Sequence, residues 1–204
     1  MKGSSGKFEI LVIGGNPIEV ENVRHIPFQE TNGPGWITRK KNLLAAGAKF
    51  ENMVITHNYL AFHQDWAAGF EIFGSDWNLA MTRVEDIRGR RFYDWTAWDS
   101  LEYPRYAPIP YSNRSHTSFQ FIPGAYWAAK TQFMLENPLD ENLFWGQAED
   151  VEWSLRVREK GLVLNPFSRV RHLKKHRGFK FLHSLHDDGL QINPRPDFHN
   201  WEPL

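Results

Sequence analysis

Two adjacent acids at the start of an amphipathic segment are the residues best suited to chemistry. Glu149 and Asp150 follow an aromatic-glycine turn, Trp145-Gly146, and lie in the first turn of a helix predicted over residues 147–160. A helix N-terminus favours negative charge, so we expect Asp150 to be ionised at neutral pH. Such a carboxylate can accept the proton of a hydroxyl as that oxygen attacks a carbon atom. Position alone also allows a plainer interpretation, in which both acids only complement the helix dipole.

A second polar group interrupts the most regular strand pattern of the chain, residues 52–62. The interruption is His57-Asn58, and it falls where a buried strand would reach its carboxyl edge. An imidazole is a good ligand for Mn, Fe or Zn and a poor one for Mg, whereas Asn offers only a neutral carbonyl. His57 is also able to contact a phosphate directly.

The elements that must position these residues follow from the hydrophobic pattern. Residues 8–13 predict a buried strand that ends at Gly14-Gly15, and residues 36–50 predict a helix before the strand at 52–62. The order strand, helix, strand predicts a mostly parallel α/β sheet with a right-handed crossover. Ligands of such sheets lie beyond the carboxyl ends of the strands, so we expect Gly15 and His57 on one rim.

The remaining elements are predicted from shorter patterns. Strands are expected at 24–28, 118–122 and 162–165, a helix at 125–135, a strand or helix at 77–84, and an extended loop at 104–110. We expect residues 1–7 to be a flexible lead-in and residues 8–204 to form one domain, with an irregular tail from about residue 169.

Composition excludes several classes of function. The 24 Lys and Arg residues balance 24 Asp and Glu residues, so the chain offers no strong field for nucleic acid or anionic lipid. It contains no Cys, which excludes disulfides, thiolate zinc sites and cysteine nucleophiles. No apolar run approaches membrane-spanning length, so we expect a soluble, cytoplasmic protein. Nine Trp residues suit either an open sugar-binding groove or an irregular core.

The segment at 145–161 resembles the acidic helix of GT-A glycosyltransferases, especially the family 2-like and galactosyltransferase-like groups. The shared pattern is an aromatic-glycine turn, the pair Glu149-Asp150, an Arg at position 156 and a closing Gly161. The resemblance implies a GT-A-like, Rossmann-like fold and transfer of a sugar from a nucleoside-diphosphate donor to a saccharide hydroxyl, as in polysaccharide biosynthesis. Asp150 would be the base of an inverting transfer, and Glu149 would position the base or the acceptor.

Other segments match the landmarks of that family in the same order, and the resemblance assigns them to donor or acceptor binding. The donor contacts implied are Gly14, Gly15, Lys41, Asn42, His57, Asn58, Gly124 and Ala125. Trp145 and Gly146 would face the acceptor, and Arg156 would brace the acidic helix. Lys41 replaces the Arg with which the family supports the donor diphosphate. The Lys ammonium is a single point charge, whereas an Arg guanidinium can bind a phosphate with two N–H groups.

Two features depart from the family pattern. His57-Asn58 stands where the family has an Asp-X-Asp motif for Mn or Mg, so the metal is either held by His57 and His172, with His176 as the alternate, or replaced by cations. The cations available for that role are Arg39, Lys41, Arg169, Arg171 and Lys174. The first strand and helix of the family have no counterpart before residue 8. These departures leave a second hypothesis, a non-catalytic module that binds nucleotide sugars or carbohydrate.

Overall fold

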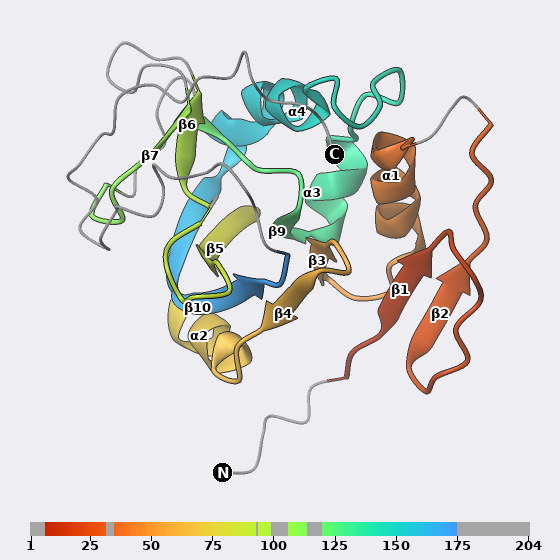
Figure 1. Cartoon of the computed structure of the whole chain (residues 1–204), viewed down its shortest axis with the longest axis horizontal. Helices are drawn as coiled ribbons and strands as arrows, with labels where there is room; N and C mark the ends of the chain where they lie inside the picture. Colours follow the sequence, from red (N-terminus) through yellow and green to blue (C-terminus); the bar gives the residue numbers. More distant parts are fainter. Residues whose placement is uncertain (1–6, 32–34, 93, 99–105, 114–119, 175–204) are drawn as a thin grey trace. The chain divides into compact units, whose positions relative to one another are not determined.

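The computed structural model describes residues 7–31, 35–92, 94–98, 106–113 and 120–174 (Figure 1). Two compact units make up the chain, and each is built from two separate stretches. The first unit comprises residues 1–53 with 130–149, and the second comprises residues 54–129 with 150–204. His176, most of the predicted tail and residues 1–6 of the predicted lead-in lie outside the described residues.

The first unit contains a two-stranded parallel sheet backed by a helix. Strand β1 (Ile10–Ile13) pairs in parallel with β2 (Val23–Ile26), and helix α1 (Ile37–Gly47) packs on one face of the pair (Figure 1). A Cβ added at Gly47 would lie 3.3 Å from the Ile26 side chain, so the helix approaches the sheet closely where its side chain is smallest. The predicted strand at 8–13 and helix at 36–50 are confirmed as elements, but the strand is not buried as expected, since Ile10 is 47% exposed.

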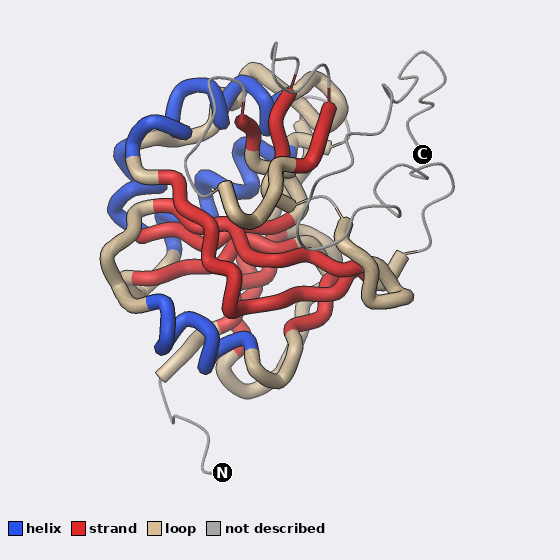
Figure 2. Tube along the Cα trace, turned by 90° about the vertical axis from the view of Figure 1, so that its left-hand side faces the viewer, coloured by secondary structure: helices blue, strands red, loops and turns tan. Residues whose placement is uncertain are grey.

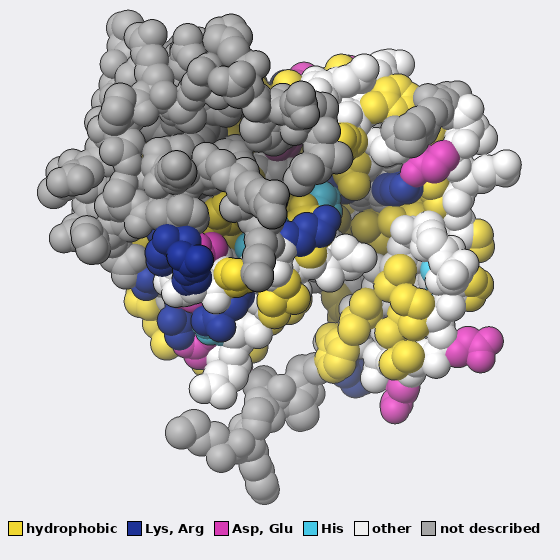
Figure 3. Space-filling view, viewed as in Figure 1, with side chains coloured by type: hydrophobic (Ala, Val, Ile, Leu, Met, Phe, Trp, Pro, Cys, Tyr) yellow, Lys and Arg dark blue, Asp and Glu magenta, His cyan; other side chains and the backbone are white. Residues whose placement is uncertain are grey.

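Apolar side chains gather on the visible surface over β1 and β2 (Figure 3). Among them Phe8 and Val20 are about three-fifths exposed. Parallel strands are normally covered on both faces, so this exposure is unusual for a parallel pair.

Helix α1 is fastened to the loop that follows the short helix α3 (Thr131–Glu136). The Thr38 hydroxyl donates to the carbonyl of Leu143 at 2.7 Å. The Asn42 side chain donates to the carbonyl of Leu139 and accepts from its backbone N–H, both at 2.9 Å. These bonds satisfy backbone groups that no regular ladder would pair.

The second unit is built on a five-stranded mixed sheet, ordered β3-β9-β5-β10-β4 (Figure 2). Its strands are β3 (Asn52–Thr56), β4 (Leu60–Phe62), β5 (Leu79–Glu85), β9 (Tyr126–Lys130) and β10 (Leu162–His172). Strand β10 runs parallel to β5 and antiparallel to β4, and β5 runs antiparallel to β9. The α/β class is confirmed, but the prediction of a mostly parallel sheet is wrong. Strands β3 and β4, which three residues join, lie at opposite edges of this order, so no helical crossover places them side by side as a parallel pair.

A smaller antiparallel sheet of order β7-β6-β8 completes the second unit. Its strands are β6 (Thr96–Trp98), β7 (Tyr106–Pro108) and β8 (Gln120–Phe121). Arg91 and Asp94, in the loop before β6, are buried. Their charges are compensated there, because Arg91 pairs with Asp94 at 2.9 Å and the Tyr111 hydroxyl donates to the same carboxylate. Burial raises the pKa of Tyr111 well above its usual value, and the negative charge of Asp94 adds to the rise. Trp95 is fully buried, which favours the core interpretation for this ring.

Two helices flank the second unit's sheets. Helix α2 (Trp66–Phe73) packs against β10 (Figure 2). Helix α4 (Glu149–Val157) continues into a 3-10 turn, Arg158–Lys160, and ends at Gly161 in the left-handed conformation. The predicted helix at 147–160 with its closing glycine is confirmed. Arg156 pairs with Glu152 one turn earlier, at 3.0 Å, and so braces the helix as expected.

Several predicted elements differ from the structure for local reasons. The single strand expected at 52–62 is two strands, because residues 57–59 form a turn. The helix expected at 125–135 begins as β9, whose short apolar run is buried between β3 and β5; periodicity does not distinguish such a run from a helix. The strand expected to stop at Pro166 continues to His172, since the Asn165 side chain accepts the N–H of Phe167 at a bulge.

One further expectation about the sheet is wrong. The strands that precede Gly15 and His57 belong to different sheets, β1 to the two-stranded sheet and β3 to the five-stranded one. A shared rim for these two residues therefore does not follow from the strand order. The reason is that β1 pairs in parallel with β2 rather than with a strand of the five-stranded sheet.

Replacing Gly69 of α2 by Ala tests the contact between α2 and β10. A Cβ there would lie 2.4 Å from Ser168 Oγ and 2.6 Å from the Phe167 carbonyl carbon, so neither the side chain nor the backbone has room for it. We expect Gly69→Ala to lower the free energy of unfolding by about 1–3 kcal/mol, although helix propensity alone predicts a gain. Urea unfolding measures the change. Ala68→Gly, at an exposed position of the same helix, is the control and should cost no more than about 1 kcal/mol; a stabilised Gly69→Ala protein would contradict the contact.

Candidate functional site

The Asp150 carboxylate is held at the start of α4 by backbone amides. Its Oδ2 accepts the N–H of Gly124 at 2.9 Å, and Oδ1 accepts the N–H of Val151 at 2.9 Å. The side chain is half-buried, and within the described residues it forms no ion pair. A carboxylate has about four lone-pair positions, so two amides leave room for a further donor.

Ser154 fixes the segment that carries Gly124. One turn after Asp150, its hydroxyl donates to the Asp150 carbonyl and accepts the N–H of Ile122 at 2.8 Å. Ser154 and Ile122 are fully buried, so this bond has no competition from water. The helix therefore holds the segment at two alternate residues, Ile122 and Gly124.

The same segment touches the polar turn after β3. The His57 N–H donates to the carbonyl of Ala125 at 3.0 Å, directly beside Gly124. Gly124 and Ala125 thus connect Asp150 to the turn that contains His57 and the exposed Asn58. The structure brings together Asp150, Gly124, Ala125 and His57, which the sequence had placed in one site.

Tyr59 stands at the centre of an aromatic and cationic group, which we call the Tyr59 cluster: His57, Tyr59, His172 and Lys174. The Tyr59 hydroxyl lies 2.5 Å from His57 Nδ1, and its ring centroid lies 4.7 Å from that of His172. The ammonium of Lys174 lies over the same ring, 4.2 Å from its centroid. Burial raises the pKa of the Tyr59 hydroxyl, so the hydroxyl stays protonated at neutral pH.

The Tyr59 cluster is a poor fit for a divalent metal. Over the described parts of the chain, no three His, Asp or Glu side chains come close enough to hold an ion. His172 is only 4% exposed and packs between Tyr59 and Phe92, with ring centroids 5.0 Å apart in the second pair. The ammonium of Lys174 adds a positive charge, which repels a cation and attracts an anion.

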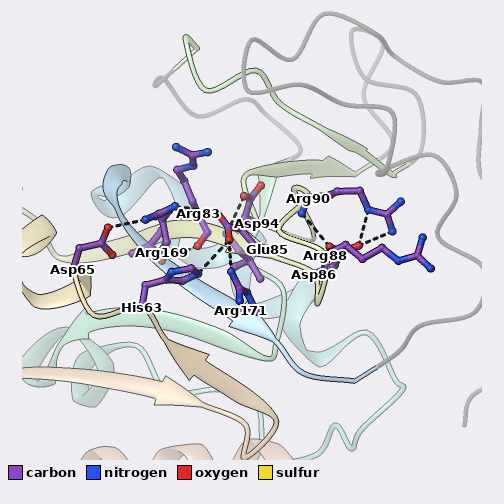
Figure 4. Close-up of polar contacts among 12 residues, drawn as sticks. His63, Asp65, Arg83, Glu85, Asp86, Arg88, Arg90, Asp94, Arg169 and Arg171 are labelled. Carbon is purple, nitrogen blue, oxygen red and sulfur yellow. Dashed lines mark hydrogen bonds and ion pairs between the residues drawn. The ribbon is translucent and has the colours of Figure 1, made fainter.

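Two of the expected cations are committed to acids instead. Figure 4 shows His63, Arg169 and Arg171 converging on Glu85. Arg169 lies 2.7 Å from Asp65, Arg171 lies 3.5 Å from Glu85, and His63 Nε2 lies 3.1 Å from the same carboxylate. The hydrogen bond between Arg169 and Asp65 lowers the pKa of Asp65 and raises the pKa of Arg169. These pairs tie the ends of β5 and β10 to the loop before α2.

The candidates in the first unit have mostly structural contacts. Lys41 is 2% exposed, so its side chain lies inside the unit. The Asn42 amide is occupied by Leu139 and Glu141, and Arg39 pairs with Glu141 at 2.5 Å. Their contacts explain how α1 is fastened and offer no direct support for a diphosphate site.

The glycine turns and the acceptor candidates of the first unit are more accessible. Gly14 and Gly15 follow β1 with φ of 74° and 70°, a conformation that other residues rarely adopt. Trp145 is 47% exposed, and Gly146 follows it with φ of 82°. Glu149, in contrast, is buried.

Sequence reasoning missed two residues of the arrangement around Asp150. Ser154 lies four residues after Asp150, so helical spacing places both on one face, and this signal was available. Tyr59 follows the polar pair directly, but its central position depends on the turn that brings β4 back beside β10. No sequence pattern predicts that pairing.

Comparison with known proteins gives no independent assignment: no protein-family model matches the chain, and no curated protein matches it. Within the described stretches, none of the helices is long and apolar enough to cross a membrane.

Replacing Ser154 by Ala tests whether this hydroxyl holds the segment. The change leaves the N–H of Ile122 buried without its acceptor, and the loss of such a partner costs about 1–3 kcal/mol. We therefore expect a corresponding loss in the free energy of unfolding, measured with urea. Glu152→Gln, which alters a surface pair of the same helix, is the control and should change stability by less than about 0.5 kcal/mol. Equal stability of the two variants would show that the hydroxyl is dispensable.

Proposed function

We propose that this chain is a glycosyltransferase of the GT-A type, with Asp150 as the general base of an inverting sugar transfer. The donor is a nucleoside-diphosphate sugar and the acceptor is a saccharide hydroxyl. The GT-A assignment is part of the proposal. Its support is a series of contacts. The acidic helix binds the Pro-Gly-Ala segment at 123–125, and that segment binds the turn at 57–59.

The observation that carries the proposal is that Asp150 has no counter-charge among the residues that the structure describes. Every other buried or half-buried acid described in the second unit lies beside an Arg: Asp65, Glu85, Asp86, Asp94 and Glu152. The hydrogen bonds that Asp150 accepts within the described part of the chain come from two backbone amides. Charges withdrawn from water are normally paired, and a departure from that rule is expected where a residue has a function.

The reaction uses this carboxylate as follows. The acceptor hydroxyl donates a hydrogen bond to Asp150, and its oxygen attacks the anomeric carbon of the donor sugar. The proton passes to Asp150 as the new carbon–oxygen bond forms. The bond from the anomeric carbon to the diphosphate oxygen breaks on the opposite face, and the electron pair leaves with the diphosphate. The sugar is therefore transferred with inversion.

The Tyr59 cluster is suited to the leaving diphosphate. Lys174 is exposed, and its ammonium contacts the Tyr59 ring; within the described residues it pairs with no acid. A cation held over an aromatic ring keeps its charge available to an incoming anion. Because the cluster does not suit a divalent metal, Lys174 is the group we assign to the diphosphate charge.

The second candidate function is a binding module that no longer transfers sugar. The turn at 57–59 provides no carboxylate for a metal-bridged diphosphate, and this observation favours the module. The two functions differ in one result. A module would bind nucleotide sugars and release no nucleoside diphosphate.

Asp150→Asn tests the assignment of the base. The amide keeps the shape of the side chain and can still accept the N–H of Gly124, but it cannot take up a proton. We expect kcat to fall at least about 100-fold, while the affinity for the donor stays within about twofold. Release of nucleoside diphosphate from a panel of nucleotide sugars, with saccharide acceptors and with or without Mn²⁺, provides the measurement.

Glu152→Gln is the control, because it removes one acid from the same helix and should transfer at the parent rate. Transfer by Asp150→Asn at the parent rate would contradict the assignment. A parent protein that binds donors and transfers nothing would support the module instead.

Lys174→Ala tests the diphosphate site separately from the reaction. Inorganic pyrophosphate is the probe, and its Kd is measured by calorimetry with EDTA present. Removing one charge in contact with the anion costs about 1 kcal/mol near the surface, so we expect Kd to rise about fivefold. Arg88→Ala removes an exposed positive charge elsewhere in the second unit and should leave Kd unchanged. Equal affinities for all three proteins would remove Lys174 from the site.

A further inference from the structure

Gln120 is a buried amide whose hydrogen bonds are unmade. It lies in β8 with 0% of its surface exposed, and neither Oε1 nor Nε2 has a hydrogen-bond partner among the described residues. Its cross-strand neighbour in β6 is Ala97, which has only a methyl group to fill the space opposite. The chain therefore places two donors and an acceptor in its interior, beside the smallest chiral side chain, without using them.

An unused amide is costly for a folded protein. Buried polar side chains almost always have a partner, so each exception requires an explanation. Leu or Met would fill the same volume without an unmet polar group. Groups that reduce stability in this way are expected where a ligand makes use of them.

The position of Gln120 connects it to Asp150. Strand β8 continues into Ile122 and Gly124, whose N–H groups bind Ser154 and Asp150. Two residues of extended chain span at most about 7 Å, so Gln120 lies within about 7 Å of Ile122 and within about 14 Å of Gly124. An amide side chain and one sugar unit cover a distance of that order.

We propose that Gln120 is a specificity residue that binds a neutral hydroxyl or amide group of the saccharide ligand. An amide presents donor and acceptor side by side, which matches sugar hydroxyls or an acetamido group. A phosphate or carboxylate offers only acceptors, so it would leave Gln120 Oε1 without a hydrogen-bond donor. The inference rests on the proposed function, because the ligand is the saccharide that Asp150 would activate.

The experiment compares the parent protein with Gln120→Leu and Gln120→Met. The first measurement is Tm without ligand, which we expect to rise by about 2–6 °C in both variants because an unmet amide is removed. The second is Kd for glucose, galactose, N-acetylglucosamine, cellobiose, lactose and chitobiose, by ligand-observed NMR. We expect the best-bound saccharide to bind about tenfold more weakly to both variants, whereas Kd for inorganic pyrophosphate stays unchanged.

Each outcome decides the matter. A higher Tm with weaker saccharide binding supports the proposal. A lower Tm in both variants would show that the amide is satisfied by an internal water, and unchanged saccharide affinity would show that it meets no ligand; either result overturns the proposal. Absence of saccharide binding by the parent across this panel also overturns it. If saccharides bind through Gln120 but no donor is turned over, the proposed reaction fails and this subsite remains.

Discussion

The hydrogen bond from the Gly124 N–H to the Asp150 carboxylate is the contact on which the rest of the site depends. It joins the first turn of α4 to the segment between β8 and β9. Ser154 repeats the attachment one turn along the helix, at Ile122. Because the next residue, Ala125, accepts the N–H of His57, the position of the carboxylate relative to the polar turn is set by backbone groups. Residues 57, 122, 124 and 125 contribute backbone groups to these bonds, whereas Asp150 and Ser154 contribute their side chains.

The charges of the second unit divide into two groups that differ in purpose. Around Glu85 the acids and arginines neutralise one another across β5, β10 and the loop before α2, so they hold strands together. Around Asp150 and Lys174 the opposite holds. The Asp150 carboxylate is hydrogen-bonded by backbone amides, and the Lys174 ammonium lies over the Tyr59 ring. Neither Asp150 nor Lys174 has an ion-pair partner among the described residues, and the proposed function rests on this difference.

The acidic helix and its closing glycine could be predicted from sequence because local signals determine them. Acids at the first turn, apolar residues at helical spacing and Gly161 at the end all agree. The direction of the strands could not be predicted, because β4 pairs with β10 across more than a hundred residues. The short apolar run of β9 carries no period that separates strand from helix. The pairing of β1 with β2 in a sheet of their own likewise leaves no local signal in either short strand.

The same distinction applies to the site. Asp150, His57, Gly124 and Ala125 were predicted as members of one site through a resemblance, and their mutual contacts follow from the strand pairing. Tyr59, Ser154 and Gln120 matter because of what lies opposite them, and a linear sequence does not record that. Lys41 and Asn42 show the converse: a polar pair at the expected place whose contacts are internal.

A crystal structure of the chain with a nucleoside diphosphate and a bound saccharide would test the central claim most directly. The account predicts a saccharide hydroxyl about 3 Å from an Asp150 oxygen, with the Gly124 N–H still bound to the carboxylate. A carboxylate closed by an Arg or Lys ion pair, or ligands bound away from it, would contradict the account.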